Sequence, residues 1–268
     1  MKFDLHIHHY RCGHARGDIE DYIQAALDRG LDVIGISDHS PYFGMEDDHP
    51  YPGLTMAKSD FAGYVEEVQQ LKEKYKDRIE VLLGVESDYL EASAQTYQSV
   101  YEAYSMDYVI GSVHFVNGIN IFNKTRWFGL GEKEILDVKE EYYRLIEKSA
   151  KSGMFQVLGH IDAIKGYFPD ISDVQTDKVD QALRTIGEEE TAIEVNTSGK
   201  MKDCGGWYPS DDILERARYY KIPITLGSDS HDPDRIGDDL EKVRDHLKAI
   251  GYRQWYFFRN KKPVAVPL

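Results

Sequence analysis

The chain alternates seven times between a short apolar run rich in β-branched residues and a longer segment whose apolar residues recur at helical spacing. The short runs predict strands over residues 3–8, 32–37, 80–85, 108–113, 156–160, 192–197 and 223–228. The longer segments predict helices over residues 18–29, 56–75, 94–104, 132–151, 173–189, 210–220 and 233–250. Such alternation is typical of parallel strands joined by crossover helices. The sequence therefore predicts an α/β fold with an all-parallel sheet.

The domain organisation follows from length and from the absence of a linker. No stretch rich in Pro, Gly or Ser divides the 268 residues, and this length is normal for a single α/β barrel. We therefore expect one domain over residues 1–268. Residues 41–54 form the longest irregular stretch and are expected to be a loop over the strand ends. The aromatic and basic tail, 251–268, is expected either to close the barrel or to cover its bottom.

Charge and composition exclude several partners. The 32 basic and 47 acidic residues give a formal net charge of −15, which repels nucleic acid and anionic membranes. A small anionic substrate remains compatible, because bound divalent metal ions would reverse the field locally. The chain has no apolar run long enough to span a bilayer, no start resembling a signal peptide and only two cysteines. We therefore expect a cytoplasmic protein; its oligomeric state is not indicated.

Histidines gather at the ends of the predicted strands. Seven of the ten lie at or just beyond the carboxyl end of a strand: His6, His8, His14, His39, His114, His160 and His231. The third strand ends in a carboxylate instead, Glu86, and the seventh is followed by Asp229. In parallel barrels the loops at this end converge on one axis. Burying so many polar groups is costly unless something coordinates them, so the pattern predicts a cluster of metal ions.

The spacing within these motifs supports the same interpretation. His6 and His8 are two residues apart on a strand, so their imidazoles point to the same face and can reach one ion. Asp229 and His231 repeat that spacing near the other end of the chain. Imidazole mixed with carboxylate suits zinc, iron or manganese and is poor for calcium.

Together these motifs resemble the polymerase and histidinol phosphatase (PHP) superfamily, and within it the monofunctional histidinol-phosphate phosphatases. The motifs are His6-Ile7-His8 with His14, Ser37-Asp38-His39, Gly84-Val85-Glu86, Ser112-Val113-His114, Gly159-His160-Ile161-Asp162 and Ser228-Asp229-Ser230-His231. The resemblance implies a distorted (β/α)7 TIM-like barrel. It also implies a metal-dependent phosphomonoesterase that hydrolyses L-histidinol phosphate to L-histidinol and phosphate through a metal-bound hydroxide.

The resemblance further implies two or three divalent ions of zinc, iron or manganese, held in three groups of residues. His6, His8, Glu86 and Asp229 would hold the first ion. Glu86 would bridge to a second ion, which His114 and His160 complete. His14, His39 and His231 would hold the third.

Other polar residues near the strand ends are candidates for contacts with substrate. Asp162 is the candidate general acid for the leaving alcohol, with hydrogen bonding to a ligand imidazole as its alternative role. Phosphate usually meets a guanidinium or ammonium as well as a metal. The candidates for that contact are Arg16, Arg126 and Arg235. Asn196 and Ser198 are candidate substrate contacts beyond the sixth strand, and Asp88 is a candidate partner for a substrate amine.

Three alternatives use similar residues. A PHP-type phosphatase acting on nucleotides or phosphotyrosine would use the same metal frame. An amidohydrolase-like barrel also has an HxH motif and a late Asp, although it usually adds a carboxylated lysine or orders its ligands differently. Metal storage or sensing predicts closed coordination, whereas nine ligands spread over three ions leave positions open for water and substrate.

Overall fold

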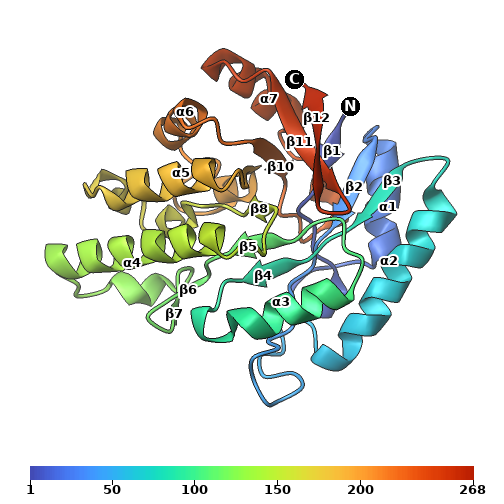
Figure 1. Cartoon of the computed structure of the whole chain (residues 1–268), viewed down its shortest axis with the longest axis horizontal. Helices are drawn as coiled ribbons and strands as arrows, with labels where there is room; N and C mark the ends of the chain where they lie inside the picture. The colour runs from blue at the N-terminus through green and yellow to red at the C-terminus, as the bar shows by residue number, and fades with distance from the viewer.

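The computed structural model describes residues 1–268 and places a parallel barrel at the centre of the molecule (Figure 1). The barrel strands are β1 (Phe3–Asp4), β2 (Val33–Ile36), β3 (Glu80–Leu83), β4 (Glu86–Asp88), β5 (Ile110–Ser112), β8 (Val157–Leu158), β9 (Ala192–Asn196) and β10 (Ile224–Gly227). They form two parallel sheets, in the orders β1-β2-β3 and β10-β9-β8-β5-β4. Each predicted strand contains an observed one, and the prediction of an α/β fold is confirmed.

Two isolated bridges join these sheets into a closed, distorted barrel. A parallel bridge between Ile7 and Ser230 continues β1 alongside β10. A second parallel bridge, between His39 and Glu86, continues β2 alongside β4. Because β3 and β4 follow one another within a single extended run, they act as one barrel strand. The prediction of a distorted barrel with seven βα units is therefore confirmed.

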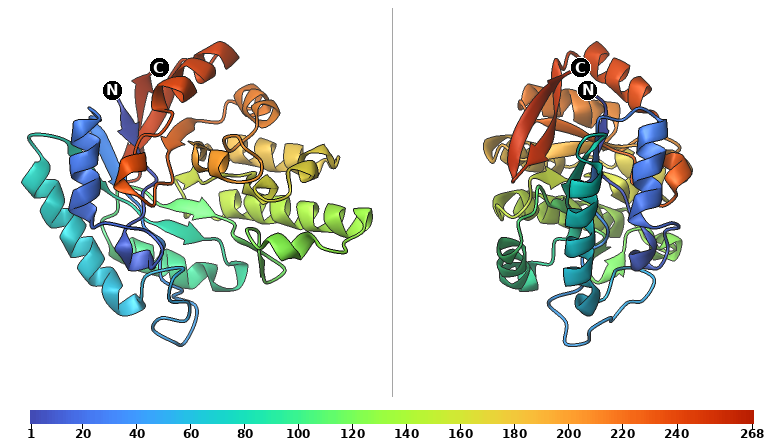
Figure 2. Two further views of the ribbon diagram at one scale, coloured as in Figure 1. Left: turned by 180° about the vertical axis from the view of Figure 1, so that it is seen from behind. Right: turned by 90° about the vertical axis from the view of Figure 1, so that its right-hand side faces the viewer.

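Helices cover the outside of the barrel (Figure 2). They are α1 (Ile19–Asp28), α2 (Phe61–Tyr75), α3 (Ala94–Ala103), α4 (Glu132–Lys151), α5 (Lys178–Glu188), α6 (Asp211–Tyr219) and α7 (Leu240–Ile250). Short 3₁₀ turns lie between them: η1 (Tyr10–Cys12), η2 (Lys58–Asp60), η3 (Glu91–Ser93), η4 (Lys124–Trp127), η5 (Ala163–Lys165), η6 (Pro169–Asp173), η7 (Ser198–Met201) and η8 (Pro233–Arg235). None of the helices combines the length and the apolar character needed to cross a lipid bilayer.

Three helices begin at least five residues later than the sequence predicts. The 233–250 segment starts with η8 and becomes helical only at Leu240, because Gly237 and Asp239 have φ angles of 64° and 58° in the left-handed region. A right-handed helix cannot pass through such residues. The 173–189 segment likewise becomes α-helical only at Lys178, and the 56–75 segment only at Phe61, after η2. All three differences lie at helix starts and leave the topology unchanged.

The inside of the barrel is filled by Tyr108, and two glycines make room for it. Its hydroxyl group donates a hydrogen bond to the backbone oxygen of Leu5 at 2.6 Å. A Cβ atom on Gly35 would lie 2.1 Å from Tyr108, and one on Gly84 would lie 2.3 Å from it. Because the ring occupies this space, the interior of the barrel below the carboxyl ends of the strands is a packed core.

The C-terminal tail packs across the amino ends of the strands. It forms an antiparallel hairpin of β11 (Gln254–Arg259) and β12 (Lys262–Pro267). The ring centroid of Trp255 lies 4.9 Å from that of Phe3 in β1, and Arg259 pairs with Glu80 at the start of β3. The hairpin therefore covers the bottom of the barrel, beside the chain's N-terminus (Figure 1).

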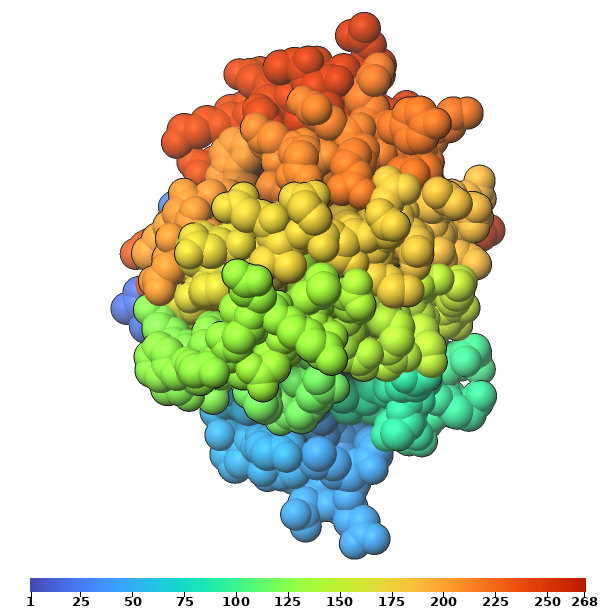
Figure 3. Space-filling view, turned by 90° about the vertical axis from the view of Figure 1, so that its left-hand side faces the viewer, coloured from blue at the N-terminus to red at the C-terminus, as the bar shows by residue number.

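The opposite end of the barrel carries the long connections. Residues 41–57 link β2 to η2 and form the blue lobe that projects from the body in the space-filling view (Figure 3). A second, smaller hairpin of β6 (Phe115–Val116) and β7 (Ile119–Asn120) follows β5. These connections surround the carboxyl ends of the strands, where the predicted metal ligands lie.

Candidate metal centre and active site

The predicted metal ligands meet at the carboxyl end of the barrel, and Glu86 lies at their centre. Its Oε1 atom is 3.4 Å from His6 Nε2 and 3.5 Å from His114 Nε2. The same oxygen is 2.9 Å from His160 Nε2. Its other oxygen, Oε2, is 2.7 Å from His39 Nδ1. Glu86 is thus placed to bridge two ions.

Asp229 closes the first group of ligands from the other side. Its Oδ1 atom lies 3.1 Å from His8 Nε2 and 3.8 Å from His6 Nε2. The Ser198 hydroxyl group donates to its Oδ2 atom at 2.9 Å, which fixes the carboxylate in this direction. His6, His8, Glu86 and Asp229 therefore surround one volume.

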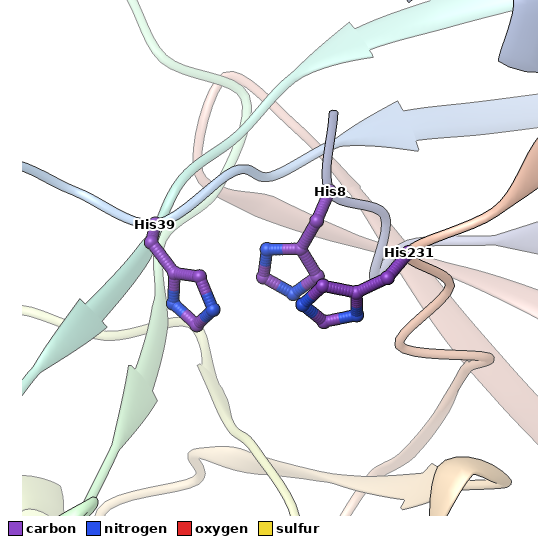
Figure 4. Close-up of side chains that lie close together, drawn as sticks. All are labelled: His8, His39 and His231. Atoms are coloured by element: carbon purple, nitrogen blue, oxygen red, sulfur yellow. The ribbon is translucent and has the colours of Figure 1, made fainter. Parts of the chain in front are cut away.

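A further group lies toward the solvent. His14 Nε2 and His231 Nε2 approach to 2.9 Å, and the rings of His8 and His231 are stacked with centroids 4.1 Å apart. Figure 4 shows His8, His39 and His231 turned toward a common space. One ring nitrogen from each of these three histidines lies within 4.8 Å of the other two. The structure therefore groups His39 and His231 of the third predicted site with His8 of the first, while His14 lies beside His231 and its ring centroid is 5.2 Å from that of His39.

The donor atoms fit divalent transition metals. His6 Nε2, His8 Nε2 and Glu86 Oε2 are buried, and despite the short distances around them none makes a hydrogen bond of acceptable geometry. Such atoms are costly in a protein interior unless an ion or water satisfies them. A set of imidazoles and carboxylates at these separations is the donor set expected for zinc, iron or manganese.

The electrostatics of the cluster also suit cations. Burial by itself would raise the pKa of the Glu86 carboxyl group, but the facing imidazoles of His6, His39 and His114 hold that pKa well below its usual value. The Asp229 carboxyl group shows the same balance: burial acts to raise its pKa, but the imidazoles of His6, His8 and His231 together hold that pKa well below its usual value. Both carboxylates are therefore negatively charged at neutral pH.

Buried carboxylates orient the imidazoles from behind. His6 Nδ1 lies 2.7 Å from Glu194 Oε1, and the other oxygen of Glu194 accepts from the backbone N–H of His160 at 3.1 Å. His114 Nδ1 lies 3.0 Å from Asp88 Oδ1. Contacts of this kind select the tautomer whose Nε2 atom is free for a metal. The sequence analysis missed Glu194, although a glutamate within the buried run Ala-Ile-Glu-Val-Asn is a detectable signal.

Two of the predicted ligands have unusual backbone conformations. His160 has a φ angle of 28° and Asp229 one of 52°, both in the left-handed region that non-glycine residues seldom adopt. Backbone strain of this kind is concentrated at functional sites, where the surrounding structure holds it. In this conformation the His160 side chain faces Glu86, and the Asp229 side chain faces His8.

Comparison with known proteins agrees with this geometry. A family model described as the PHP domain matches residues 4–198. The chain belongs to the PHP family. A Deinococcus radiodurans protein named probable histidinol-phosphatase is 32% identical over 97% of this chain and 97% of its own length. The Bacillus subtilis histidinol-phosphatase is 30% identical over 88% of this chain and 96% of its own length.

A solved structure shares the fold of this PHP protein. It is the histidinol phosphate phosphatase of Lactococcus lactis in complex with zinc, L-histidinol and phosphate. It superposes with a TM-score of 0.81, covers 98% of both chains and is 21% identical in sequence. PHP proteins are metal-dependent phosphoesterases, so family membership and the donor set together show that this chain uses divalent metal.

A cavity of about 420 Å³ opens above the predicted metal ligands of this PHP protein. Three of the predicted substrate contacts line it: Asp88, Ser198 and Arg235. The Asp88 carboxylate also accepts from the Tyr42 hydroxyl group at 2.9 Å. The Arg235 guanidinium is held at the wall by Asp238, at 2.7 Å. These three residues are therefore in reach of a bound molecule.

The structure does not place the other predicted substrate contacts in the cavity wall. Arg126 is buried and donates to the backbone oxygen of Ile119 at 2.7 Å, so its guanidinium braces the β6–β7 hairpin and has no access to phosphate. Arg16 is exposed and pairs with Asp232. Asn196 is fully buried and donates to Asp229 Oδ2 at 3.3 Å, so it supports a ligand rather than the substrate.

The position of Asp162 corrects its expected role as general acid. Its Oδ2 atom accepts from Lys165 Nζ at 2.7 Å and from the backbone N–H of Ser210 at 2.9 Å. It lines a separate cavity of about 80 Å³ between α4, α5 and α6, away from the larger one. Asp162 therefore ties the loop after β8 to the start of α6.

One cationic residue of the cavity wall was not predicted. Lys202 lines the cavity, and its Nζ atom lies 5.1 Å from the ring centroid of Phe122 and 5.4 Å from that of Tyr167. Unlike Arg235, it forms no ion pair with a carboxylate. The sequence could have indicated Lys202 as a candidate substrate contact, because it lies in the loop after the sixth strand, close to Ser198.

Proposed function

We propose that this PHP protein is a histidinol-phosphatase, a phosphomonoesterase that hydrolyses L-histidinol phosphate to L-histidinol and phosphate. The observation that carries the proposal is the single cavity above the metal ligands, which combines free donor atoms, cationic groups and aromatic side chains. The relatives named for this activity match the chain over nearly its whole length.

We propose three metal sites. His6, His8, Glu86 and Asp229 hold the first ion, Glu86 with His114 and His160 hold the second, and His14, His39 and His231 hold the third. Zinc is the proposed metal, since it is bound in the L. lactis relative and suits this donor set. When bound, the ions supply positive charge that neutralises phosphoryl oxygens and lowers the pKa of water.

The side chains of the protein fix the reacting groups and their surroundings. Ser198 and Asn196 hold Asp229, and Glu194 holds His6, so the ligands are in place before the substrate arrives. Lys202 and Arg235 supply positive charge at the cavity wall for the phosphate group.

The outer part of the cavity suits the rest of the substrate. Phe115 and Phe122 offer an aromatic surface on which an imidazole ring can pack. Asp88 offers a carboxylate to the primary ammonium group of the substrate. A substrate that carries a phosphate, an ammonium group and a small aromatic ring therefore matches all three features.

Phosphate release from a small panel of compounds tests the proposal. The panel contains L-histidinol phosphate, nucleoside monophosphates, phosphotyrosine and an aryl phosphate, each assayed with zinc-loaded enzyme. We expect a kcat/KM for L-histidinol phosphate at least about tenfold above the others, roughly 1.4 kcal/mol of transition-state preference. A zinc-loaded enzyme that prefers another phosphoester would overturn the substrate, and one that cleaves none would overturn the phosphatase activity.

A further inference from the structure

Behind the metal ligand His8 lies a second histidine, His9, whose polar atoms have no evident purpose in packing. Its side chain is fully buried, and neither ring nitrogen has a hydrogen-bond partner. Its ring stacks on Tyr64, with centroids 5.5 Å apart and planes at 23°. A phenylalanine would make the same stacking contact without burying two unpaired nitrogen atoms, which is costly.

The nearest polar group to His9 is the carboxylate of Asp38. His9 Nε2 lies 3.3 Å from Asp38 Oδ2, and both side chains are fully buried. Asp38 Oδ2 is also buried and makes no hydrogen bond. The unpaired atoms His9 Nε2 and Asp38 Oδ2 therefore face each other.

The other oxygen of Asp38 holds the metal ligand. Asp38 Oδ1 lies 3.3 Å from His8 Nδ1 and accepts from the backbone N–H of His39 at 2.9 Å. His8 presents its other nitrogen, Nε2, to the first metal site, 3.1 Å from Asp229 Oδ1. The three side chains thus form a row in which His9 contacts Asp38 and Asp38 contacts His8.

We propose that His9 is a positioning residue for the metal centre, which donates from Nε2 to Asp38 and so holds that carboxylate against His8. A buried carboxylate with one unsatisfied oxygen is free to turn toward other donors. With His9 in place, Asp38 keeps Oδ1 on His8 Nδ1, and His8 keeps the tautomer whose Nε2 atom faces the metal. His9 acts through Asp38 and touches neither metal nor substrate.

Zinc affinity, measured by competition with a chromophoric chelator, tests this role without reference to hydrolysis. His9→Gln places an amide nitrogen close to the position of Nε2, whereas His9→Asn has the same chemistry but is one methylene too short to reach Asp38. His9→Phe keeps the stacking on Tyr64 and removes both nitrogens. The matched control is His246→Phe, which removes an imidazole whose Nε2 lies 2.9 Å from Asp211 on the outside of the molecule.

We expect His9→Phe and His9→Asn to weaken the binding of zinc by about tenfold or more, as is usual for residues behind a metal ligand. The zinc affinity of His9→Gln is expected to stay within about threefold of the wild-type value, and that of His246→Phe to equal the wild-type value. When cobalt replaces zinc, the absorption spectrum of His9→Asn should differ from that of wild type, and the spectrum of His9→Gln should match it. Wild-type affinity in both His9→Phe and His9→Asn would overturn the proposal, as would equal losses in all three variants.

The inference rests on the proposed metal centre but is independent of the substrate. If His9→Asn loses zinc and wild-type enzyme fails to cleave L-histidinol phosphate, the substrate is wrong and the positioning role stands. If wild-type enzyme cleaves it and the His9 variants bind zinc normally, only the positioning role fails. Should His9→Phe not fold, the pair His9→Asn and His9→Gln still decides the question.

Discussion

At the scale of single residues, Glu86 joins the two halves of the proposed centre, because imidazoles approach both of its oxygen atoms. The ligands themselves were identified by their recurrence at strand ends, since convergence there follows from the fold. The hydrogen-bond and ion-pair partners of individual polar side chains could not be identified from the sequence. Arg126, Asp162 and Lys202 all lie in loops near the strand ends, and only the folded surroundings determine which of them faces the cavity.

Replacing the central carboxylate tests its bridging position. Glu86→Gln keeps the shape of the side chain but removes the charge shared by two ions. We expect bound zinc to decrease by at least one ion per chain and kcat/KM to fall by more than about a hundredfold. Metal analysis after gel filtration and phosphate release measure the two effects. A variant with wild-type zinc content and activity would contradict the role of Glu86.

Lys202 is the residue whose contact with the phosphate group is most readily isolated. A charge-assisted hydrogen bond contributes about 1.5–3 kcal/mol, so Lys202→Met should weaken competitive inhibition by inorganic phosphate about tenfold or more. Inhibition by L-histidinol, which has no phosphate group, should not change. Lys124→Met, at an exposed lysine paired with Asp203, is the control. Equal effects on both inhibitors would show that Lys202 does not contact phosphate.

At the scale of secondary-structure elements, the sequence predicted every covering helix and every barrel strand except β4, which continues the predicted strand 80–85, because their hydrophobic periodicity is local. It misplaced the start of α7, where left-handed residues at Gly237 and Asp239 depend on tertiary contacts of the loop. For the tail 251–268, the sequence could not distinguish closing the barrel from covering its bottom. The packing of Trp255 on Phe3 involves the two ends of the chain, and no local pattern predicts such a contact.

The packing of strands around Tyr108 gives a prediction about stability. Gly84→Ala would place a Cβ atom 2.3 Å from the Tyr108 ring, and overpacking of this kind typically costs about 1–3 kcal/mol. Gly63→Ala, in α2 with no atom within 4 Å, should instead stabilise the protein by about 0.5–1 kcal/mol. Urea unfolding of both variants measures the difference. A destabilisation of equal size at both positions would contradict this account.

At the scale of the whole molecule, Asp239 links two loops that supply cavity residues. Its carboxylate accepts from Lys200 at 3.0 Å and from Trp207 Nε1 at 3.1 Å in the loop after β9, and from Lys242 at 2.7 Å in α7. Burial acts to raise the pKa of Asp239, but the hydrogen bonds from Lys242, Lys200 and Trp207 together lower it to about 2.

This pKa predicts how stability depends on pH. Because the pKa is lower in the folded state than in the unfolded chain, where it is about 3.9, the contribution of Asp239 is present above about pH 4. It is lost as the pH falls from about 4 to 2. The difference in unfolding free energy between wild type and Asp239→Asn, measured on metal-free protein, should therefore shrink over that range. A difference that stays constant from neutral pH to pH 2 would contradict the assignment.

The central claim is that the histidines and carboxylates at the end of the barrel hold metal ions that are needed to hydrolyse L-histidinol phosphate. Stripping the enzyme with a chelator and adding zinc back in known equivalents, while phosphate release is followed, tests it most directly. We expect the stripped enzyme to be inactive and activity to return, reaching a plateau at two to three equivalents of zinc. Full activity in the stripped enzyme, or no phosphate release after reconstitution, would contradict the account.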